Sequence, residues 1–426
     1  MTDLRVEPGG PLRGTLRVPG CKGISHRALL LAAIADGTSE IRGLADGADV
    51  RSTRRALEHL DLSVSEVPGG VRVVGRGFDM LSEPDDPIDC GNSGTTMRML
   101  AGMLAGRPMD AVLTGDASLS RRPMGRVVEP LRALGARIET VDGHAPLTIA
   151  GRVLVGAEVD LGVSSGQVKS AVILAGLQAS GTTTVREPAP SRDHTERMLA
   201  ALGAPIERLD ACTVRVGTIG ALDRFEVDIP GDASSAAFLV VAAAIVPGSE
   251  VTIVEVNLNP GRIAYLEILR AMGADIDVVA RGERLGEPVG DLTVRSAPLR
   301  GVRIVSDEGI VDELPILAVA GAAAEGRTEI VGAAELRVKE SDRIETTTAM
   351  LRAFGVTTET TSDGLVVDGG TLRAASVDSS GDHRIAMCAA VAALRADGAS
   401  TITGWEAVDV SYPGFAADLA GLRGDR

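Results

Sequence analysis

The motif that recurs along this chain first reads PGCKGISHRALLLAAI, at residues 19–34. A polar, basic segment leads directly into an alanine- and leucine-rich run that predicts a helix. The first turn of a helix carries unpaired N–H groups and the positive end of the macrodipole, so it can bind an anion. Lys22 and Arg27 would add full positive charges to that partial one. Basic residues at helix starts are also common on solvated surfaces, so this motif alone does not establish a ligand site.

Lysine is rare in this chain. Of its 43 Lys and Arg residues, only Lys22, Lys169 and Lys339 are lysine. Lysine is a compact ammonium group whose pKa can shift, whereas arginine is a permanently charged planar fork, so the two are not interchangeable in a reaction. We therefore treat the three lysines as candidate functional residues. Chance retention in an arginine-rich composition is the alternative.

Length and composition predict a soluble protein of two or three domains. A chain of 426 residues is too long for one core, and its 45% hydrophobic and 24% charged residues are typical of globular proteins. The N-terminus lacks the apolar region of a signal peptide, and the longest apolar helical run, 236–246, is too short to cross a bilayer. We expect a cytoplasmic protein that does not bind a membrane.

Charge and cysteine content narrow the possible partners. The net charge of −15 argues against nucleic acid and would repel an anionic substrate, so any phosphate ligand must be held by locally concentrated Lys and Arg. We expect small-molecule ligands, no metal and a monomer. The four cysteines lie far apart without metal-ligand spacing and are expected to be reduced thiols: Cys21, Cys90, Cys212 and Cys388.

The motif occurs six times, at a spacing of roughly 70 residues. In each copy a polar segment precedes an apolar helix, a glycine turn and a short strand, as at 22–41 and again at 92–114. A second helix that ends in a leucine and glycine turn follows, and then further strands, which gives a βαβαββ unit. The other copies begin near Ser164, Ser234, Asp312 and Asp382.

The sixth copy lacks its last strands, whereas residues 1–18 supply two strands without a helix. We therefore expect the N-terminal strands to complete the sixth unit. The expected domains are 21–229, and 1–20 together with 230–426. Helices this apolar must be buried. The predicted fold is thus α/β: a two-domain inside-out α/β barrel of six repeats, with buried helices, sheets outside, and helix starts gathered at a cleft.

Several charged motifs coincide with predicted helix starts. Residues 91–98 form a glycine-rich segment without the Gly-Lys-Ser/Thr of a P-loop, and 120–125 place two guanidinium groups before a helix. Charges alternate along 336–343, and the Asp312-Glu313 and 382–384 segments precede apolar helices. Solvated helix starts, surface ion pairs and simple N-caps are the alternative interpretations.

Together these motifs resemble those of the 5-enolpyruvylshikimate-3-phosphate synthase family, the 3-phosphoshikimate 1-carboxyvinyltransferases. The resemblance covers the entire chain. Residues 165–170 and 192–196 resemble a subgroup that contains glyphosate-tolerant enzymes. The most specific motifs are 22–27, 122–125, 337–343 and 382–384.

The resemblance implies a reaction and a set of site residues. The family transfers the enolpyruvyl group of phosphoenolpyruvate to the 5-hydroxyl of shikimate 3-phosphate by addition and elimination, without a metal or organic cofactor. Asp312 would accept the hydroxyl proton and Glu340 would donate one to the methylene carbon, with Lys22 assisting. Shikimate 3-phosphate would contact Lys22, Gly23, Arg27, Ser165, Gly166, Gln167, Arg192, Asp312 and Lys339. Phosphoenolpyruvate would contact Lys22, Gly94, Arg122, Gln167, Arg343 and Arg384.

The chain departs from the family pattern at a few positions. Gly23 replaces the usual serine, which removes one hydroxyl donor and about one hydrogen bond, roughly 1 kcal/mol. Cys21 stands where serine or aspartate is usual, and Val410 and Ser411 replace a segment that often carries lysine. Glyphosate-tolerant members carry alanine where this chain has Gly94, so we expect sensitivity to glyphosate.

Two other functions are weighed against this one. A UDP-N-acetylglucosamine enolpyruvyl transferase shares the repeat but uses a loop cysteine, and residues 113–124 contain none. A non-catalytic ligand-binding paralogue is suggested by Gly23 and Cys21, although the charged motif residues Asp312, Glu340 and Arg384 argue against it.

Overall fold

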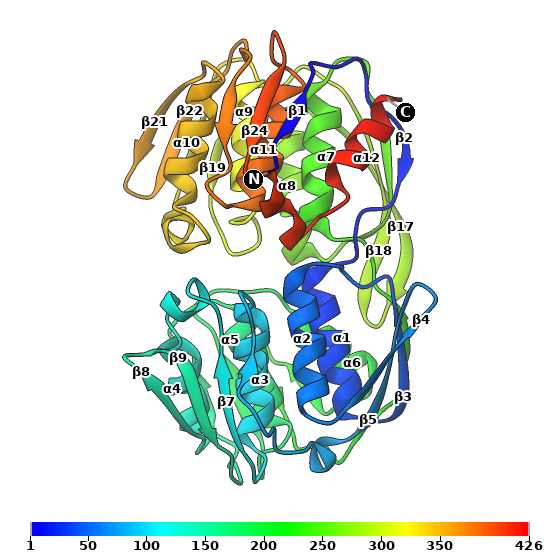
Figure 1. The fold of residues 1–426 in the computed structure, drawn as a ribbon, viewed down its shortest axis with the longest axis vertical. Helices are drawn as coiled ribbons and strands as arrows, with labels where there is room; N and C mark the ends of the chain where they lie inside the picture. The colour runs from blue at the N-terminus through cyan, green and yellow to red at the C-terminus, as the bar shows by residue number, and fades with distance from the viewer. Residues whose placement is uncertain (1, 425–426) are drawn as a thin grey trace. The chain divides into compact units, whose positions relative to one another are not determined.

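The computed structural model describes residues 2–424, and the chain divides into two compact units (Figure 1). The N-terminal segment packs with the C-terminal half of the chain, and residues 283–287, the tip of one hairpin, pack with the other unit. Unit 1 comprises Met1–Pro19, Pro230–Gly282 and Pro288–Arg426, and unit 2 comprises Gly20–Ile229 and Glu283–Glu287.

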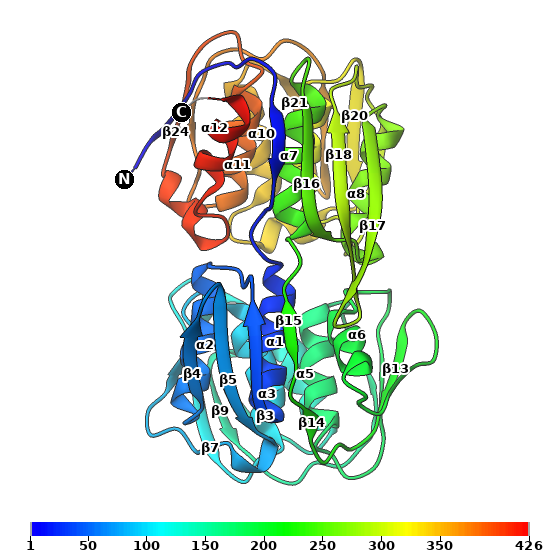
Figure 2. The ribbon, with the colours of Figure 1, turned by 90° about the vertical axis from the view of Figure 1, so that its right-hand side faces the viewer.

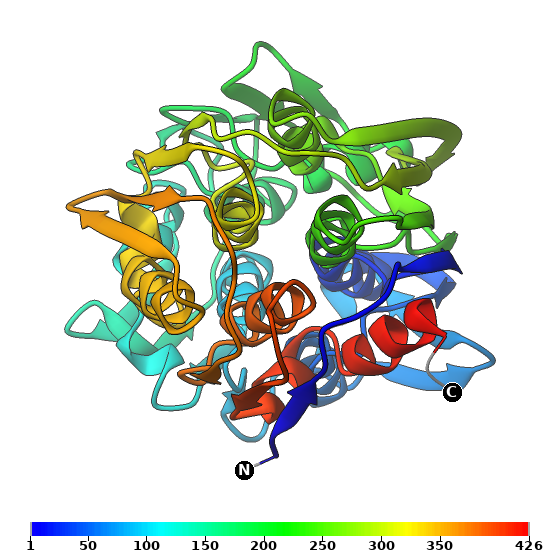
Figure 3. The same cartoon turned by 90° about the horizontal axis from the view of Figure 1, so that it is seen from above.

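Three inner helices lie in each unit of the described chain, and almost all of their residues are buried. All residues of the inner helices α7 (Ala233–Ile245) and α9 (Leu314–Ala322) are buried, because their sequences are apolar on almost every side. The inner helices of unit 1 are seen end-on in Figure 3, with strands at the periphery. The inner helices are α1 (Lys22–Ile34), α3 (Gly94–Ala105) and α5 (Gly166–Gly176) in unit 2, and α7 (Ala233–Ile245), α9 (Leu314–Ala322) and α11 (His383–Ala393) in unit 1.

Close packing of α3 on α5 depends on a glycine. A Cβ atom on Gly102 of α3 would lie 2.0 Å from the main-chain oxygen of Ala171 in α5. No side chain fits in that space, so the two backbones can approach each other only with glycine at this position.

A second helix follows each inner helix and has one exposed face. Four of these helices end as the leucine and glycine turns predicted: Gly135, Gly203, Gly273 and Gly355 have φ values of 92°, 74°, 102° and 80°. A left-handed residue at this position closes a helix C-terminus, and glycine adopts it without strain. The second helices are α2 (Ala48–His59), α4 (Gly125–Ala133), α6 (His194–Ala201), α8 (Pro260–Ala271), α10 (Arg343–Ala353) and α12 (Phe415–Arg423).

The strands of residues 2–424 form six sheets, three in each unit, some of which are seen in Figure 2. Parallel and antiparallel pairs occur in every sheet. Five sheets have one parallel pair, and in the sixth both Leu222–Asp223 and Glu226–Asp228 pair parallel with Ala35–Arg42. The sheets of unit 2 are β14 (Leu222–Asp223) and β15 (Glu226–Asp228) with β3 (Ala35–Arg42), β5 (Gly70–Arg76) and β4 (Ser63–Val67); β6 (Ile88–Asp89), β7 (Asp110–Thr114), β9 (His144–Ala150) and β8 (Arg137–Val141); and β10 (Glu158–Asp160), β11 (Thr183–Arg186), β13 (Thr213–Val216) and β12 (Ile206–Arg208). Those of unit 1 are β2 (Arg13–Leu16), β16 (Glu250–Asn257), β18 (Glu287–Arg295) and β17 (Asp275–Arg284); β19 (Arg303–Val305), β20 (Arg327–Val331), β22 (Gly364–Asp368) and β21 (Thr357–Thr361); and β23 (Ser376–Asp378), β24 (Ser400–Thr403) and β1 (Leu4–Val6).

The two N-terminal strands join two different repeats: β1 completes the sheet of the sixth repeat, whereas β2 joins the sheet of the fourth, so the prediction that both complete the sixth repeat is wrong for β2. Strand β1 pairs antiparallel with β24, with Leu4 opposite Ile402, which is the place that β22 takes beside β20 in the preceding repeat. Strand β2 pairs parallel with β16, with Gly14 opposite Val251, as β6 does with β7. The α/β prediction, with buried helices and sheets outside, is confirmed. The predicted barrel consists only of this arrangement of helices inside and sheets outside, because none of the sheets in residues 2–424 closes on itself.

Each unit has its own core, made mainly of Ala, Val, Leu and Ile side chains with some Met and Phe. Within residues 2–424, the structure contains no helix with the length and apolar character that a membrane span requires.

Candidate active site

Lys22 is the first residue of α1, and its ammonium is held by a carboxylate on the neighbouring helix. Lys22 Nζ lies 2.6 Å from Asp49 Oδ2, in the first turn of α2. One turn further along both helices, His26 Nδ1 lies 2.6 Å from Thr53 Oγ1. These two interactions fix the start of α1 against α2. Asp49 belongs to none of the charged motifs, so its place in the site was not predicted from the sequence.

Arg27 is buried and is used mainly to hold helices together. Its side chain donates to Thr195 Oγ1 at 2.6 Å, Gly23 O at 2.8 Å, Ser170 Oγ at 2.7 Å and Gly166 O at 3.2 Å. These bonds use four of the five N–H groups of the guanidinium. Burial lowers the pKa of Arg27 to about 10. The residue therefore joins α1 to α5 and α6, with one N–H left for a ligand.

Gly23 lies beside His194, the first residue of α6. A Cβ atom at Gly23 would lie 3.4 Å from His194 Cδ2, an ordinary van der Waals distance. The structure thus has room for a Cβ atom at the position where the family resemblance implies a serine. His194 Nδ1 lies 2.7 Å from Glu287 Oε1, and both side chains are almost fully buried. His194 belongs to the 192–196 segment but was given no role from the sequence, and Glu287 was not predicted.

The start of α5 brings several predicted residues together. Ser165 caps the helix by accepting from Val168 N at 3.5 Å. A Cβ atom on Gly166 would lie 3.1 Å from both Cβ and the main-chain oxygen of Arg192, so this glycine lets the Arg192 segment approach the helix. Gln167 Oε1 accepts from Arg98 Nη1 at 2.6 Å, and its Nε2 donates to a threonine of α3 at 2.9 Å.

Lys169 lies within a buried ion triad. Its Nζ is 2.7 Å from Glu187 Oε1 and 2.8 Å from Glu196 Oε1, and Glu187 Oε1 also accepts from Ser191 N at 3.0 Å. Burial alone would lower the pKa of Lys169, but the two glutamates raise it above its ordinary value. This lysine therefore anchors the segment that carries Arg192, which explains why a compact ammonium is kept here.

Gly94 lies beside a second group of hydrogen-bond donors in unit 2, the side chains of Arg98 and Arg122. A Cβ atom on Gly94 would lie 2.8 Å from Arg98 Nη1 and 3.6 Å from Arg122 Nη1. Arg122 Nη2 donates to Asn92 Oδ1 at 2.7 Å, and Asn92 Nδ2 donates to Asp116 at 2.7 Å. The structure thus brings together the glycine-rich segment and the Arg-Arg-Pro segment, which the sequence indicated only as separate candidate anion-binding segments.

The predicted residues of unit 1 converge on Arg343, the first residue of α10, whose side chain is 1% exposed. Its Nε donates to Asp382 Oδ2 at 2.8 Å and its Nη2 to Glu340 Oε2 at 2.7 Å. Its Nη1 lies 3.5 Å from Asp312 Oδ1. Asp382, for which a simple N-cap was the alternative interpretation, both caps α11 and pairs with this arginine.

Asp312 lies in the turn before α9 with cations around its carboxylate. Lys339 Nζ is 3.6 Å from Asp312 Oδ1, and Arg384 Nη1 donates to the main-chain oxygen of Asp312 at 2.5 Å. Two positive groups within 4 Å orient the carboxylate and stabilise its charge. A carboxylate held in this way can accept a proton from a hydroxyl placed beside it.

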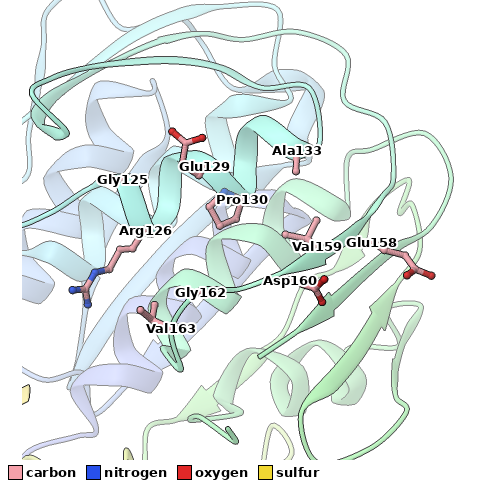
Figure 4. A pocket seen from close by; sticks show the side chains of 10 residues that line it. All are labelled: Gly125, Arg126, Glu129, Pro130, Ala133, Glu158, Val159, Asp160, Gly162 and Val163. Atoms are coloured by element: carbon pink, nitrogen blue, oxygen red, sulfur yellow. The ribbon is translucent and has the colours of Figure 1, made fainter. Parts of the chain in front are cut away.

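A separate pocket of about 490 Å³ lies in unit 2 between α4 and β10 (Figure 4). Its charged lining residues are Arg126, Glu129, Glu158 and Asp160. None of the predicted substrate residues lines it. With three carboxylates and one guanidinium, it does not suit an anionic substrate. Among residues 2–424, no group of three or more His, Cys, Asp and Glu side chains is placed to hold a metal ion.

Comparison with known proteins identifies the family. Residues 6–419 match the family model for EPSP synthase (3-phosphoshikimate 1-carboxyvinyltransferase). The chain belongs to this family. The 3-phosphoshikimate 1-carboxyvinyltransferase of Halorhodospira halophila is 53% identical over 418 residues, which cover 96% of this chain and 94% of the relative. That of Acidithiobacillus ferrooxidans is 51% identical over 423 residues, which cover 98% of this chain and 97% of the relative.

A solved structure supports the same EPSP synthase membership. The EPSP synthase of Acinetobacter baumannii superposes with a TM-score of 0.90 at 40% sequence identity, and the match covers 99% of this chain and 98% of that one. The family resemblance and the fold predicted from the sequence are therefore confirmed. The curated relatives are transferases named for 3-phosphoshikimate, which supports the main interpretation and not the UDP-N-acetylglucosamine alternative.

Proposed function

We propose that this EPSP synthase family member transfers the enolpyruvyl group of phosphoenolpyruvate to the 5-hydroxyl of shikimate 3-phosphate, releasing phosphate. Its relatives, about half identical over nearly the full chain, carry the name of that activity. The observation that carries the proposal is the arrangement around Asp312, where a carboxylate lies between the side chains of Lys339 and Arg343. Such a group can act as a base while its cationic neighbours bind an anion.

The proposed chemistry uses one base and one acid. Asp312 takes the proton of the 5-hydroxyl, whose oxygen then bonds to the central carbon of phosphoenolpyruvate. Glu340 donates a proton to the methylene carbon, and Lys22 assists proton transfer. In the second step a proton leaves the new methyl group, the carbon–oxygen bond to phosphate breaks, and the double bond forms again. The protein needs only acid–base groups and anion-binding groups for these steps.

The substrate assignments are part of the proposal. The lysine and arginine side chains of the site now bind protein carboxylates and carbonyl groups. When substrates bind, these side chains would exchange some of those protein acceptors for substrate oxyanions. We assign shikimate 3-phosphate to Lys22, Gly23, Arg27, Ser165, Gly166, Gln167, Arg192, Asp312 and Lys339. We assign phosphoenolpyruvate to Lys22, Gly94, Arg122, Gln167, Arg343 and Arg384. We also propose that the protein acts as a monomer in the cytoplasm, without a metal or organic cofactor.

A coupled phosphate-release assay tests the function. The purified protein should release phosphate from phosphoenolpyruvate when shikimate 3-phosphate is present, and not when UDP-N-acetylglucosamine replaces it. Release with the nucleotide sugar would favour the alternative transferase, and no release with either acceptor would favour a non-catalytic paralogue. The same assay with added chelator checks the cofactor assignment, and sedimentation checks the monomer.

A further inference from the structure

Glu313 is a fully buried carboxylate that does not serve its own helix. It immediately follows Asp312 and is the N-cap residue of α9, but its side chain makes no capping hydrogen bond. The side chain is 0% exposed. A buried carboxylate that does not cap a helix must be stabilised by other partners, because isolated buried charge is costly.

The partners of Glu313 come from the starts of neighbouring helices. Ser234 Oγ, in the first turn of α7, donates to Glu313 Oε1 and itself accepts a hydrogen bond from Arg262 Nη2. Arg262 Nη2 lies 3.8 Å and Arg384 Nη1 lies 3.6 Å from the same Glu313 oxygen. One buried carboxylate thus connects α7, α8 and α11 within unit 1.

Arg384 is held along one side of its guanidinium. Its Nη1 lies near Glu313 Oε1 and donates to Asp312 O, so two consecutive residues fix this nitrogen. Among residues 2–424, the Arg384 side chain makes no other hydrogen bond, which leaves Nε and Nη2 without a protein acceptor. Those two nitrogens form the edge of the guanidinium that presents two parallel N–H groups, the geometry for bidentate binding of an oxyanion.

Arg343 shows the opposite arrangement. Its Nε and Nη2 edge is already bound by the carboxylate of Asp382. The two arginines therefore differ in what they can offer a ligand, although both lie near Asp312. Arg384 offers the bidentate edge, whereas Arg343 offers only what remains at Nη1.

We propose that Glu313 is a positioning residue, which fixes Nη1 of Arg384 so that the Nε and Nη2 edge binds an oxyanion of phosphoenolpyruvate. Arg262 balances the charge of Glu313, and Ser234 fixes the orientation of its carboxylate. The proposal rests on the function proposed above, because it takes phosphoenolpyruvate as the bound anion. Glu313 touches no substrate and acts only through Arg384.

The test is the steady-state kinetics of Glu313→Gln, which keeps the shape of the side chain and removes its charge. The KM for phosphoenolpyruvate should rise about tenfold or more, the effect of disturbing a charge-assisted hydrogen bond, while the KM for shikimate 3-phosphate changes less than about twofold. Glu313→Asp, which keeps the charge, should give an intermediate KM. Ser234→Ala should also raise the KM for phosphoenolpyruvate and serves if the glutamine variant does not fold.

The matched control is Asp291→Asn. Asp291 is also a largely buried carboxylate of unit 1 that is paired with an arginine, with Arg281 Nη2 at 2.7 Å, but it lies on strand β18. It should change both KM values by less than about twofold. A folded Glu313→Gln protein with an unchanged KM for phosphoenolpyruvate, or with both KM values raised equally, would overturn the proposal. A wild-type protein without phosphate release would instead overturn the proposed function.

Discussion

Arg343 and Asp382 form a bidentate ion pair, with Nε 2.8 Å from Oδ2 and Nη2 3.2 Å from Oδ1. Neither side chain is more than 1% exposed. Burial alone would lower the pKa of Arg343, but Glu340, Asp382 and Asp312 raise it above its ordinary value. Burial alone would raise the pKa of Asp382, but Arg343 holds it below its usual range. Both groups therefore stay charged, and the stability of each depends on the other.

Asp382→Asn should be strongly destabilising for this reason. Asparagine can still cap α11 by accepting from Arg384 N, so the change removes the charge and keeps the cap. Leaving Arg343 buried without this carboxylate should lower the free energy of unfolding by about 3 kcal/mol, measured by urea denaturation at pH 7. Because the pKa of Asp382 is lowered in the folded state, its contribution is present above the ordinary aspartate pKa and is lost in acid.

Asp342→Asn is the control for that experiment. Asp342 caps α10 in the same way and pairs with Arg337 at 2.7 Å, but both side chains are about one-third exposed. Removing the charge of Asp342 should therefore lower the free energy of unfolding by less than about 1 kcal/mol. If Asp382→Asn and Asp342→Asn lowered the free energy of unfolding equally, burial of the Arg343–Asp382 pair would not be the cause of the large effect expected for Asp382→Asn.

The fold could be predicted from the sequence because its signals are local. A largely apolar inner helix such as α7 occurs six times in the described chain, and a glycine such as Gly273 ends four of the second helices. The close contact between α3 and α5 at Gly102 has no such local pattern in the sequence, so it could not be predicted.

The candidate site could be predicted only in part. Charged motifs at helix starts pointed to Lys22 and Arg343, but not to the residues that hold them. Arg27 donates to Thr195, which is 168 positions away, and Lys22 is paired with Asp49, 27 positions away. Such partners are ordinary polar residues in their own segments. Only folding brings them together, so spacing along the chain carries no signal for them.

Asp312→Ala should abolish most turnover while ligands still bind. The variant lacks the proposed base but keeps Lys339 and Arg343, whose charges lie near the missing carboxylate. We expect kcat to fall by about 10²- to 10⁴-fold, the range of general-base catalysis. Calorimetric titration of shikimate 3-phosphate should still show binding. Near-native kcat for Asp312→Ala would contradict the assignment.

His26 should make the protein less stable in mild acid. Burial lowers the pKa of His26 to about 3, and its Nε2 is buried without a hydrogen-bond partner. Because the unfolded chain binds a proton near pH 6.5 and the folded chain does not, stability should fall as the pH drops below about 6.5. Between pH 7 and pH 5, His26 should lower the free energy of unfolding by about 2 kcal/mol.

His26→Gln isolates this effect from other groups, including His383, whose pKa is lowered to about 4 by burial and by Arg343. The variant can still bond to Thr53, but its unfolding free energy should depend less on pH, by about 2 kcal/mol between pH 7 and pH 5. The exposed His59→Gln should leave the wild-type dependence intact. If His26→Gln and wild type lose equal stability over this range, His26 is protonated in the folded state as readily as in the unfolded one.

Gly94→Ala should make the enzyme tolerant to glyphosate and weaken its use of phosphoenolpyruvate. The wild-type protein is expected to be sensitive, and inhibition only at millimolar glyphosate would contradict that expectation. In the variant the added methyl group would lie 2.8 Å from Arg98 Nη1, so this guanidinium must move and its bond to Gln167 at 2.6 Å must change. We expect the glyphosate concentration for half inhibition to rise by at least about tenfold and the KM for phosphoenolpyruvate to rise with it, as expected when a charge-assisted hydrogen bond is disturbed.

Gly125→Ala is the matched control for Gly94→Ala, because Gly125 is also the first residue of a helix but has no neighbouring atom within 4 Å of an added Cβ. It should leave inhibition and both KM values within about twofold of wild type. The two variants differ only in whether the new methyl group meets the arginines of the site. Equal glyphosate inhibition of Gly94→Ala and Gly125→Ala would therefore show that displacement of Arg98 does not control inhibitor binding.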